Sequence, residues 1–547
     1  MIIAWRPDWW ALRPDKNRDC NVAAMEIREV AVVGLGTMGA GIAEVFARAG
    51  IGVVAIEVDP EALRRGVGVL DASLSRAVNR GRLAAQEQAE IRSRVRPVEA
   101  FMEAAAVDLA IEVVPERLEI KRQVFAELDR VCSPTAILAT NTSSLSVTAI
   151  AAATKHPGRV IGMHFFNPAP VMRLVEVVST VLTTEGLPAA ASDLARRLGK
   201  SPVRVSDRAG FVANALLLPY LNHAVSLLET GYASREDIDR AATAGIGLPM
   251  GPLALLDLIG LDTALSIMEV LHGEFGRPRY AAAPLLRRLA DAGRTGRKSG
   301  GGIYDYADAS AGKSDPNRNI AASAAPDTVT LIGSGDDAET DLATALATAG
   351  INVTRNAAHP TDLIVIAAAP GRPVLPAALA TGRPDQAVGL HSASGELAEV
   401  IQTSLSSGRA VTSALALAAR LGYTAVRAPD RPGFLVGALL YPHLADAVRM
   451  VQDNFASPAD IDTAMTLGCG YPQGPFQLLD AAGPAAVLAG LEFMHAAYGD
   501  SSLAPPTLLA EHAVTGIAFG GSGEPAAAGP SSVGTARAGT AGAGSAG

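Results

Sequence analysis

Short apolar runs alternate with amphipathic stretches over the first part of the chain. The runs are too short for helices and rich in β-branched residues, so they predict buried strands at 28–33, 52–57, 109–113, 136–139, 160–163 and 174–178. Between the first strands, residues 62–82 have apolar positions at helical spacing and predict a long amphipathic helix. Strands that alternate with helices predict a parallel sheet covered on both faces.

The alternation stops near residue 207. Helical patterns dominate residues 209–273, punctuated by glycine and proline, and a glycine-rich stretch closes this part at 300–302. We therefore expect an α/β domain over residues 26–206 and an all-α domain over 207–307.

The second half repeats the first. Residues 432–480 match residues 209–257 at a constant offset, because Pro442 lies 442 − 219 = 223 residues after Pro219. Residues 329–356 are a weaker echo of the first strand, turn, helix and strand. We expect a duplicated two-part module whose second copy is shortened and degenerate, with an α/β remnant at 328–428 and a second helical domain at 429–517.

Three segments carry no such pattern. Residues 1–25 lack the basic-then-apolar order of a secretory signal and are expected to be a disordered leader. Residues 308–327 have the composition of a linker, and the Ala/Gly/Ser-rich residues 518–547 that of a disordered tail.

Composition narrows the class of protein. The 547 residues are 49% hydrophobic and 18% charged, which excludes a disordered polyelectrolyte, and the net charge of −9 argues against a nucleic-acid partner. No apolar run is long enough to span a membrane. Three cysteines without a CxxC pair predict neither a disulfide framework nor a zinc site, so we expect a reduced, cytoplasmic protein with no metal.

A glycine turn follows the first strand. The residues Gly34, Gly36 and Gly39, with Thr37 and Met38 between them, fit the GxGxxG pattern at a strand-to-helix turn. Gly34 permits the tight turn, Gly36 lets a pyrophosphate approach the backbone, and Gly39 lets helix and strand pack closely. The pattern predicts a Rossmann-type dinucleotide site, against the alternative of a glycine-rich loop without nucleotide.

The acid that closes the second strand indicates which dinucleotide binds. Glu57 can accept the ribose hydroxyls and would repel a 2′-phosphate, which favours NAD over NADP. In the second copy Gly333 and Gly335 survive, Ala338 replaces the third glycine, and no acid matches Glu57. We expect that copy to keep the fold without the nucleotide.

Chemistry-bearing residues gather in three motifs between residues 111 and 178. "IEVVPERLEIKRQVFAELD", "ATNTSSLSVTAIA" and "GMHFFNPAPVMRLVEVV" contain Glu116, Lys121, Asn141, Ser143, His164, Asn167 and Glu176. Over residues 26–306 the sequence closely resembles the (3S)-3-hydroxyacyl-CoA dehydrogenase family of fatty-acid β-oxidation. The resemblance implies an NAD-dependent oxidation of a 3-hydroxyacyl-CoA to the 3-ketoacyl-CoA, or the reverse reduction.

The residues themselves support this reaction. His164 suits a general base because the unperturbed imidazole pKa is near neutrality, and Glu176, on a strand able to return beside it, would hold its ring. Ser143 and Asn214 would hydrogen-bond the substrate oxygen. The alternatives are that Ser143 caps the helix beginning near Ser146 and that Asn214 is a buried residue tying helices together.

The resemblance assigns further contacts. It places Glu116 and Lys121 beside the nicotinamide ribose, with Asn141, Ser143 and Asn167 also near the cofactor; an exposed helical pair is the alternative for Glu116 and Lys121. It aligns Ser73 and Arg80, two helical turns apart, with positions that contact CoA phosphates. A solvated basic helix face is the alternative there.

The second copy departs from the family pattern at its active-site positions. His391 and Glu399 are separated by eight residues instead of the twelve between His164 and Glu176, and Gly437 stands in place of Asn214. We expect this second site to be inactive.

Two other functions stay open: a related dehydrogenase of small hydroxy acids without CoA, and a non-enzymatic NAD-binding scaffold. The family pairs its helical domains, so we expect the two helical copies to pack as an intrachain pseudo-dimer, or the chain to form a homodimer.

Overall fold

The computed structural model describes residues 26–306, 325–333, 335, 337–355 and 362–520. The expected leader at 1–25 lies outside these residues, as do all but the last three residues of the expected linker and all but the first three of the expected tail. The chain divides into two compact units, Met1–Arg208 and Ala209–Gly547.

The first unit is built on an eight-stranded sheet in the order β3-β2-β1-β4-β5-β6-β7-β8. Its strands are β1 (Glu29–Val33), β2 (Gly52–Ile56), β3 (Val95–Val98), β4 (Leu109–Glu112), β5 (Ile137–Thr140), β6 (Val160–Phe165), β7 (Leu174–Ser179) and β8 (Ser201–Ser206). The strand order reverses on either side of β1, which pairs with β2 and β4, and such a reversal leaves a crevice at the carboxyl ends of the strands.

One pair in this sheet departs from the predicted parallel arrangement. β6 and β7 run antiparallel, whereas the other neighbouring strands of the sheet are parallel. The connection of residues 166–173 is too short for a crossover helix, so the chain can only return beside the strand it has just left. The sheet is therefore mixed, and the antiparallel return brings two predicted catalytic residues side by side.

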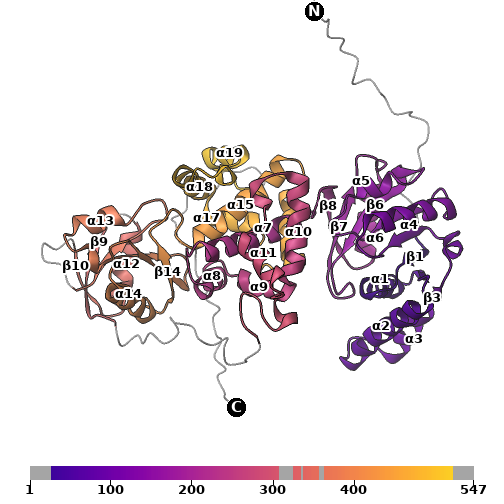
Figure 1. The fold of residues 1–547 in the computed structure, drawn as a ribbon, viewed down its shortest axis with the longest axis horizontal. Coiled ribbons are helices and arrows are strands. Elements are labelled where there is room, and N and C mark those ends of the chain that lie inside the picture. Colours follow the sequence, from indigo (N-terminus) through magenta and orange to yellow (C-terminus); the bar gives the residue numbers. More distant parts are fainter. Residues whose placement is uncertain (1–25, 307–324, 334, 336, 356–361, 521–547) are drawn as a thin grey trace, which may run out of the picture. The chain divides into compact units, whose positions relative to one another are not determined.

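Helices cover this sheet (Figure 1). They are α1 (Thr37–Arg48), α2 (Pro60–Asn79), α3 (Ala85–Ser93), α4 (Leu118–Val131), α5 (Val147–Ala151) and α6 (Leu187–Arg197). α1 packs on β1 and β2, α4 on β4 and β5, and α6 on β7 and β8. Val30 and Val32 pack with Phe46 of α1, while Ala31 and Val33, on the other face of β1, are also buried. Burial on both faces explains the continuous apolar run of this strand.

The second unit combines two sets of helices with a smaller sheet (Figure 1). The sheet has the order β10-β9-β11-β12-β13-β14, formed by β9 (Thr328–Ile332), β10 (Asn352–Arg355), β11 (Ile364–Ala367), β12 (Ala387–Ser392), β13 (Leu397–Gln402) and β14 (Thr424–Pro429). Its helices are α12 (Asp337–Thr348), α13 (Leu375–Ala380) and α14 (Gly408–Arg420). The predicted fold class, a Rossmann-type domain followed by a helical domain, is confirmed, and a second sheet follows it.

The two helical sets have matching element boundaries. The first contains α7 (Ala213–Glu229), α8 (Arg235–Arg240), α9 (Pro252–Ile259), α10 (Leu261–Phe275) and α11 (Pro284–Asp291), and the second contains α15 (Val436–Gln452), α16 (Pro458–Cys469), α17 (Pro475–Ala482), α18 (Pro484–Tyr498) and α19 (Thr507–Thr515). Both ends of α15 lie 223 residues after those of α7 (436 − 213 and 452 − 229), and α17 and α18 keep the same offset from α9 and α10. Even the rare positive φ recurs, at 46° for Phe211 and 50° for Phe434.

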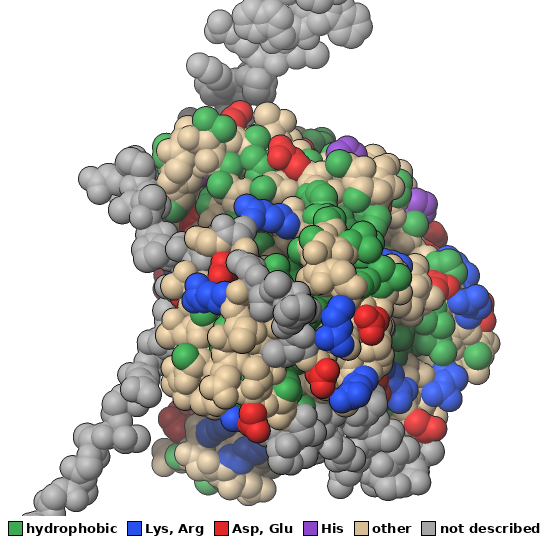
Figure 2. Space-filling view, turned by 90° about the vertical axis from the view of Figure 1, so that its left-hand side faces the viewer, with side chains coloured by type: hydrophobic (Ala, Val, Ile, Leu, Met, Phe, Trp, Pro, Cys, Tyr) green, Lys and Arg blue, Asp and Glu red, His purple; other side chains and the backbone are tan. Residues whose placement is uncertain are grey.

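Two further observations bear on the expected partners. The face in view in Figure 2 carries acidic and basic side chains interspersed among apolar and uncharged groups. Among the described residues, the helices are all too short or too polar to cross a membrane.

Candidate active site

The glycine turn joins β1 to α1 at the point where the strand order reverses. Gly34 has a φ of 93°, and a Cβ on Gly39 would lie 1.8 Å from the carbonyl oxygen of Gly34, so a side chain at either position would disrupt the turn. A Cβ on Gly36 would meet nothing within 4 Å, which leaves that side of the turn open. The N-terminus of α1 receives no side-chain cap at Gly36.

The acid predicted to bind the ribose stands next to this turn. Glu57 follows β2, and its Oε2 accepts a hydrogen bond of 3.2 Å from the backbone N–H of Leu35, inside the glycine turn. An open glycine backbone at a helix N-terminus, beside a carboxylate at the end of the neighbouring strand, fits a dinucleotide diphosphate and its ribose.

The predicted base and its partner lie directly opposite each other. In the antiparallel pair of β6 and β7, His164 is in register with Glu176. The His164 Nδ1 lies 2.7 Å from the Glu176 Oε2, and both residues are buried. A carboxylate at Nδ1 fixes the ring so that Nε2 is the nitrogen able to take a proton, and it stabilises the imidazolium that results.

Beyond the dyad, a buried ion-pair network lies at the carboxyl ends of β4 and β5. The Lys121 Nζ, on α4, contacts the Glu112 Oε1 at 2.8 Å and the Glu116 Oε2 at 3.3 Å. Glu112 also accepts hydrogen bonds from the Thr140 hydroxyl and the Val114 backbone N–H. The Lys121 side chain is only 1% exposed, so an exposed helical pair of Glu116 and Lys121 does not describe the structure.

The pKa values in this network shift in opposite directions. Burial raises the pKa of Glu112, although Lys121 and the hydrogen bonds oppose the shift. Burial acts in the same direction on Glu116, but the Lys121 ammonium and the surrounding donors outweigh it and hold the pKa of Glu116 below its usual value. The Lys121 ammonium and the surrounding donors therefore favour the ionised form of Glu116.

Glu116 also holds the turn that carries Ser143. Its Oε1 accepts hydrogen bonds from the backbone N–H groups of Ser143 at 2.9 Å and Ser144 at 3.0 Å, and from the Thr142 hydroxyl at 2.6 Å. The Ser143 hydroxyl makes the longest contact to this oxygen, 3.4 Å. Ser143 is not the helix cap, because the side chain of Ser146 accepts the capping hydrogen bond from the Ala149 N–H.

The two predicted asparagines follow neighbouring strands. The Asn141 Oδ1 accepts a hydrogen bond of 2.7 Å from the backbone N–H of Phe165, which ties the end of β5 to the end of β6. Asn167 is exposed in the loop after β6. The Lys200 Nζ donates to the carbonyl oxygens of Ala169 and Met172 and so holds this loop.

The predicted CoA contacts lie on α2 and at its end. Ser73 is half-buried within the helix, but α2 spans Pro60–Asn79 instead of residues 62–82. Arg80 is thus the exposed C-cap residue, and its backbone N–H still donates to the Arg76 carbonyl oxygen. The helix ends early because Gly81, with a φ of 67°, turns the chain.

Asn214 belongs to the second unit. It is half-buried in the first turn of α7, two residues after Val212, the N-cap residue of that helix.

The second glycine turn already holds an anion from its own chain. The Glu339 Oε2, on α12, accepts a hydrogen bond of 2.7 Å from the Gly335 N–H, and a Cβ on Gly333 would lie 2.4 Å from this carboxylate. Glu339 is buried, and its Oε1 lies 3.4 Å from the Arg355 guanidinium. An internal carboxylate therefore accepts the Gly335 N–H and fills the space beside Gly333, where a diphosphate would approach the turn.

The second histidine and acid keep the register of the first pair. His391 and Glu399 face each other in the antiparallel pair of β12 and β13, so their closer spacing in the sequence only shortens the connecting loop. What is lost is the hydrogen bond, because the His391 Nε2 lies 4.0 Å from the Glu399 Oε2. The His391 Nδ1 instead contacts the Ala368 carbonyl oxygen at 3.1 Å, and the Glu399 Oε1 accepts the N–H groups of Leu435 and Val436.

Burial moves both pKa values of this second pair toward the neutral forms. It raises the pKa of Glu399 to about 7 and lowers the pKa of His391 to about 4. A histidine whose pKa is about 4 is uncharged near neutral pH, and it does not form with Glu399 the hydrogen-bonded, charged pair that activates a base.

Several residues of the network lie outside the sequence predictions. Glu112 bonds Lys121, Thr142 and Ser144 bond Glu116, and Thr140 in turn bonds Glu112. One signal was present: Glu112 is an acid at the end of an otherwise apolar, fully buried strand. Such a position requires a charged or hydrogen-bonding partner.

Comparisons with known protein families match both parts of the chain. Residues 29–208 match the NAD binding domain of 3-hydroxyacyl-CoA dehydrogenase. Residues 210–306 and 433–524 match the C-terminal domain of 3-hydroxyacyl-CoA dehydrogenase.

Named relatives and a solved structure agree with these matches. The chain is 35% identical over 493 residues to the 3-hydroxyadipyl-CoA dehydrogenase of Escherichia coli K12, covering 90% of this chain and 98% of the relative. It is 46% identical over 282 residues to a probable 3-hydroxybutyryl-CoA dehydrogenase of Bacillus subtilis, covering 52% of this chain and 98% of the relative. A crystal structure of 3-hydroxybutyryl-CoA dehydrogenase from Escherichia coli K12 superposes with a TM-score of 0.78 at 34% identity, covering 90% of this chain and 99% of that one. The chain belongs to the 3-hydroxyacyl-CoA dehydrogenase family, and its first unit carries the NAD-binding domain of that family.

Proposed function

We propose that the first half of the chain catalyses NAD-dependent oxidation of (3S)-3-hydroxyacyl-CoA to 3-ketoacyl-CoA, and the reverse reduction. The observation that carries the proposal is the buried contact of 2.7 Å between the His164 Nδ1 and the Glu176 Oε2. It supplies a general base with a fixed tautomer, which oxidation of a secondary alcohol requires.

The proton follows a short path in this proposal. The His164 Nε2 takes the proton of the 3-hydroxyl, and the Glu176 carboxylate stabilises the imidazolium through the Nδ1–H. Ser143 and Asn214 hydrogen-bond the oxygen of the substrate, the latter assigned on the family motif alone. NAD, when held by the residues named below, would supply the hydride acceptor. In the reduction the imidazolium returns the proton to the oxygen.

The cofactor and substrate contacts are proposed from the same residues. The diphosphate of NAD would bind at the glycine turn, formed by Gly34, Gly36, Thr37, Met38 and Gly39. Glu57 would bind the ribose. The nicotinamide side would be bound by Glu116, Lys121, Asn141, Ser143 and Asn167. Ser73 and Arg80 would contact the CoA phosphates.

The second half is proposed to be a structural copy of the first. The matching element boundaries and the second match to the C-terminal domain support duplication. Contacts between α7 and α15, including the hydrogen bond from the His223 Nε2 to the Ala438 carbonyl oxygen, support an intrachain pseudo-dimer of the helical copies. We keep the domain boundaries 26–206, 207–307, 328–428 and 429–517, and a cytoplasmic location, as parts of this proposal.

A substrate comparison tests the function. We expect the purified full chain to oxidise NADH with acetoacetyl-CoA and to leave free acetoacetate essentially unreduced, because the thioester carries the CoA that Ser73 and Arg80 recognise. 3-Hydroxybutyryl-CoA and 3-hydroxyadipyl-CoA, after which the relatives are named, are the substrates for the oxidation assay. Equal activity on the free acid would favour the CoA-independent dehydrogenase, and NAD binding without turnover on either compound would favour the scaffold.

A further inference from the structure

The contact between the two helical copies is not symmetric in charge. We name residues 213–291 the first helical copy and 436–515 the second. The Arg279 Nε lies 2.6 Å from the Asp446 Oδ2, and the two side chains are 9% and 10% exposed. The Arg277 Nη2 lies 3.5 Å from the Asp453 Oδ2. Both arginines belong to the first copy and both acids to the second.

The copies meet around an approximate two-fold axis. Tyr220 and His443, which occupy equivalent positions 223 residues apart (443 − 220), contact each other with ring centroids at 5.0 Å and ring planes tilted by 48°. A residue contacts its own equivalent only where a two-fold axis passes. Every contact between the copies should then have a symmetry-related contact, which we call its mate. The mate is formed by the two residues at the equivalent positions of the opposite copies.

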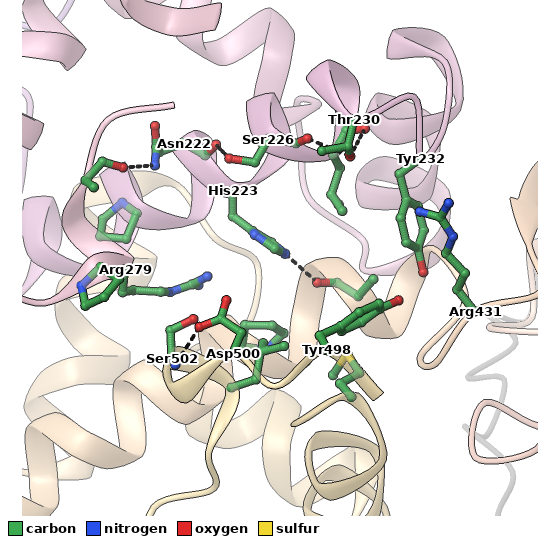
Figure 3. Close-up of a pocket in the computed structure, with 18 residues that line it drawn as sticks. Asn222, His223, Ser226, Thr230, Tyr232, Arg279, Arg431, Tyr498, Asp500 and Ser502 are labelled. Carbon is green, nitrogen blue, oxygen red and sulfur yellow. Dashed lines mark hydrogen bonds between the residues drawn. The ribbon is translucent and has the colours of Figure 1, made fainter. Parts of the chain in front are cut away.

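The mates of the two ion pairs are not ion pairs. Adding or subtracting 223 gives the equivalent residues, which are His223 for Asp446, Ser502 for Arg279, Thr230 for Asp453 and Asp500 for Arg277. The structure has a cavity of about 410 Å³ that is lined by all four (Figure 3). Burial lowers the pKa of His223 to about 4, so the residue opposite Ser502 is an uncharged imidazole.

We infer that this interface selects unlike copies and rejects pairing of either copy with itself. If two first copies met, Arg279 would face His223 and Arg277 would face Thr230, which leaves two guanidinium groups without a carboxylate. If two second copies met, Asp446 would face Ser502, and Asp453 would face Asp500, a pair of like charges. An uncompensated charge is strongly destabilising at the buried positions of Arg279 and Asp446, whereas Arg277 and Asp453, with side chains 53% and 32% exposed, contribute less.

Asp446 has a second charged partner, whereas Arg279 has Asp446 as its ion-pair partner among the described residues. The Asp446 Oδ1 is also held by Arg449 of its own helix, at 3.0 Å. The Arg279 Nη2, in contrast, is buried and has no hydrogen-bond partner among the described residues. The partner that the first copy fits is therefore a helical face with an acid at the position of Asp446, which the second copy of this same chain provides. This inference rests on the proposed duplication and not on the proposed catalysis.

The chain's own repeat supplies the test. Arg279→Ser gives the first copy the residue of the second, and Asp446→His gives the second copy the residue of the first. Each single change in the full chain should lower the melting temperature by roughly 5–10 °C, because Arg279→Ser removes the cross-copy partner of Asp446 and Asp446→His removes the carboxylate from Arg279 and Arg449. The double variant should recover at least half of the summed loss, because neither charge of the buried pair remains and the two positions then carry the residues of their equivalents, His223 and Ser502.

Controls separate this effect from general loss of stability. Arg287 and Glu269 form an ion pair inside the first copy with both side chains about half exposed, and Arg287→Ser should change the melting temperature by no more than about 1 °C. Circular dichroism melts of the four variants and the wild type give the comparison. Single variants that melt like the wild type, or a double variant that loses the sum of the two single shifts, would overturn the inference. The NADH assay is independent of this outcome, so failure here leaves the proposed function standing.

Discussion

At the scale of single residues, strand register brings His164 and Glu176 together, and burial determines the ion pair of Glu112 and Lys121. His164 and Glu176 were expected to meet, and the antiparallel register of β6 and β7 places them opposite each other. Glu112 was missed because its partner Lys121 lies nine positions later on another element, and no local spacing links the two. Burial, which only the fold defines, is what makes this ion pair matter.

Glu112 provides a residue-scale prediction. Glu112→Gln removes the charge that fixes the Lys121 Nζ, while the amide oxygen can still accept from the Val114 N–H and the amide NH2 can donate to the Thr140 hydroxyl. The KM for NAD should rise about tenfold, the scale of a lost charged hydrogen bond, with kcat changed by less than about threefold. Steady-state kinetics at varied NAD measure both constants. Glu119→Gln is the matched control, because Glu119 is exposed on α4, the helix that carries Lys121. An unchanged KM for NAD in Glu112→Gln would contradict the proposal that Glu112 positions Lys121 for the cofactor.

At the scale of elements, hydrophobic patterns predicted the buried strands of the first sheet and missed its two edges. β3 reads VRPV and β8 reads SPVRVS, so proline and arginine interrupt the apolar pattern in both. Edge strands tolerate such residues because one side of the strand makes no ladder hydrogen bonds. Gly81 likewise ended α2 earlier than its apolar periodicity indicated. Local hydrophobic patterns predict fully buried strands well, but they miss strands that are only partly buried.

The two glycine turns give a prediction at this scale. The first turn is open at Gly36, whereas in the second turn the Glu339 carboxylate accepts the Gly335 N–H. Isothermal titration of the full chain with NAD should therefore give about one site per chain. Gly39→Ala should abolish that site, because the new Cβ would lie 1.8 Å from the Gly34 carbonyl oxygen. Ala338→Gly should leave the count at one, because Glu339 remains; two sites in the wild type would contradict this reading of the second turn.

At the scale of the whole molecule, the first half of the chain carries the proposed catalytic pair, and the second half repeats its helices. The repeat in the sequence predicted the second set of helices, whose boundaries follow the first at the same offset. The spacing of His391 and Glu399 was a wrong reason for an inactive second site, because their register is intact. The structure shows instead that Glu399 has turned to the backbone of Leu435 and Val436, a change that depends on packing and leaves no trace in spacing.

The measurement that tests the account most directly compares these two histidines in one assay. His164→Ala and His391→Ala change residues at the same register of the two sheets. With acetoacetyl-CoA and NADH, kcat should fall by about 100-fold or more in His164→Ala, the scale of general acid–base catalysis, and stay within about twofold of the wild type in His391→Ala. Near-normal turnover in His164→Ala, or an equal loss in both variants, would contradict the assignment of the reaction to the first half of the chain.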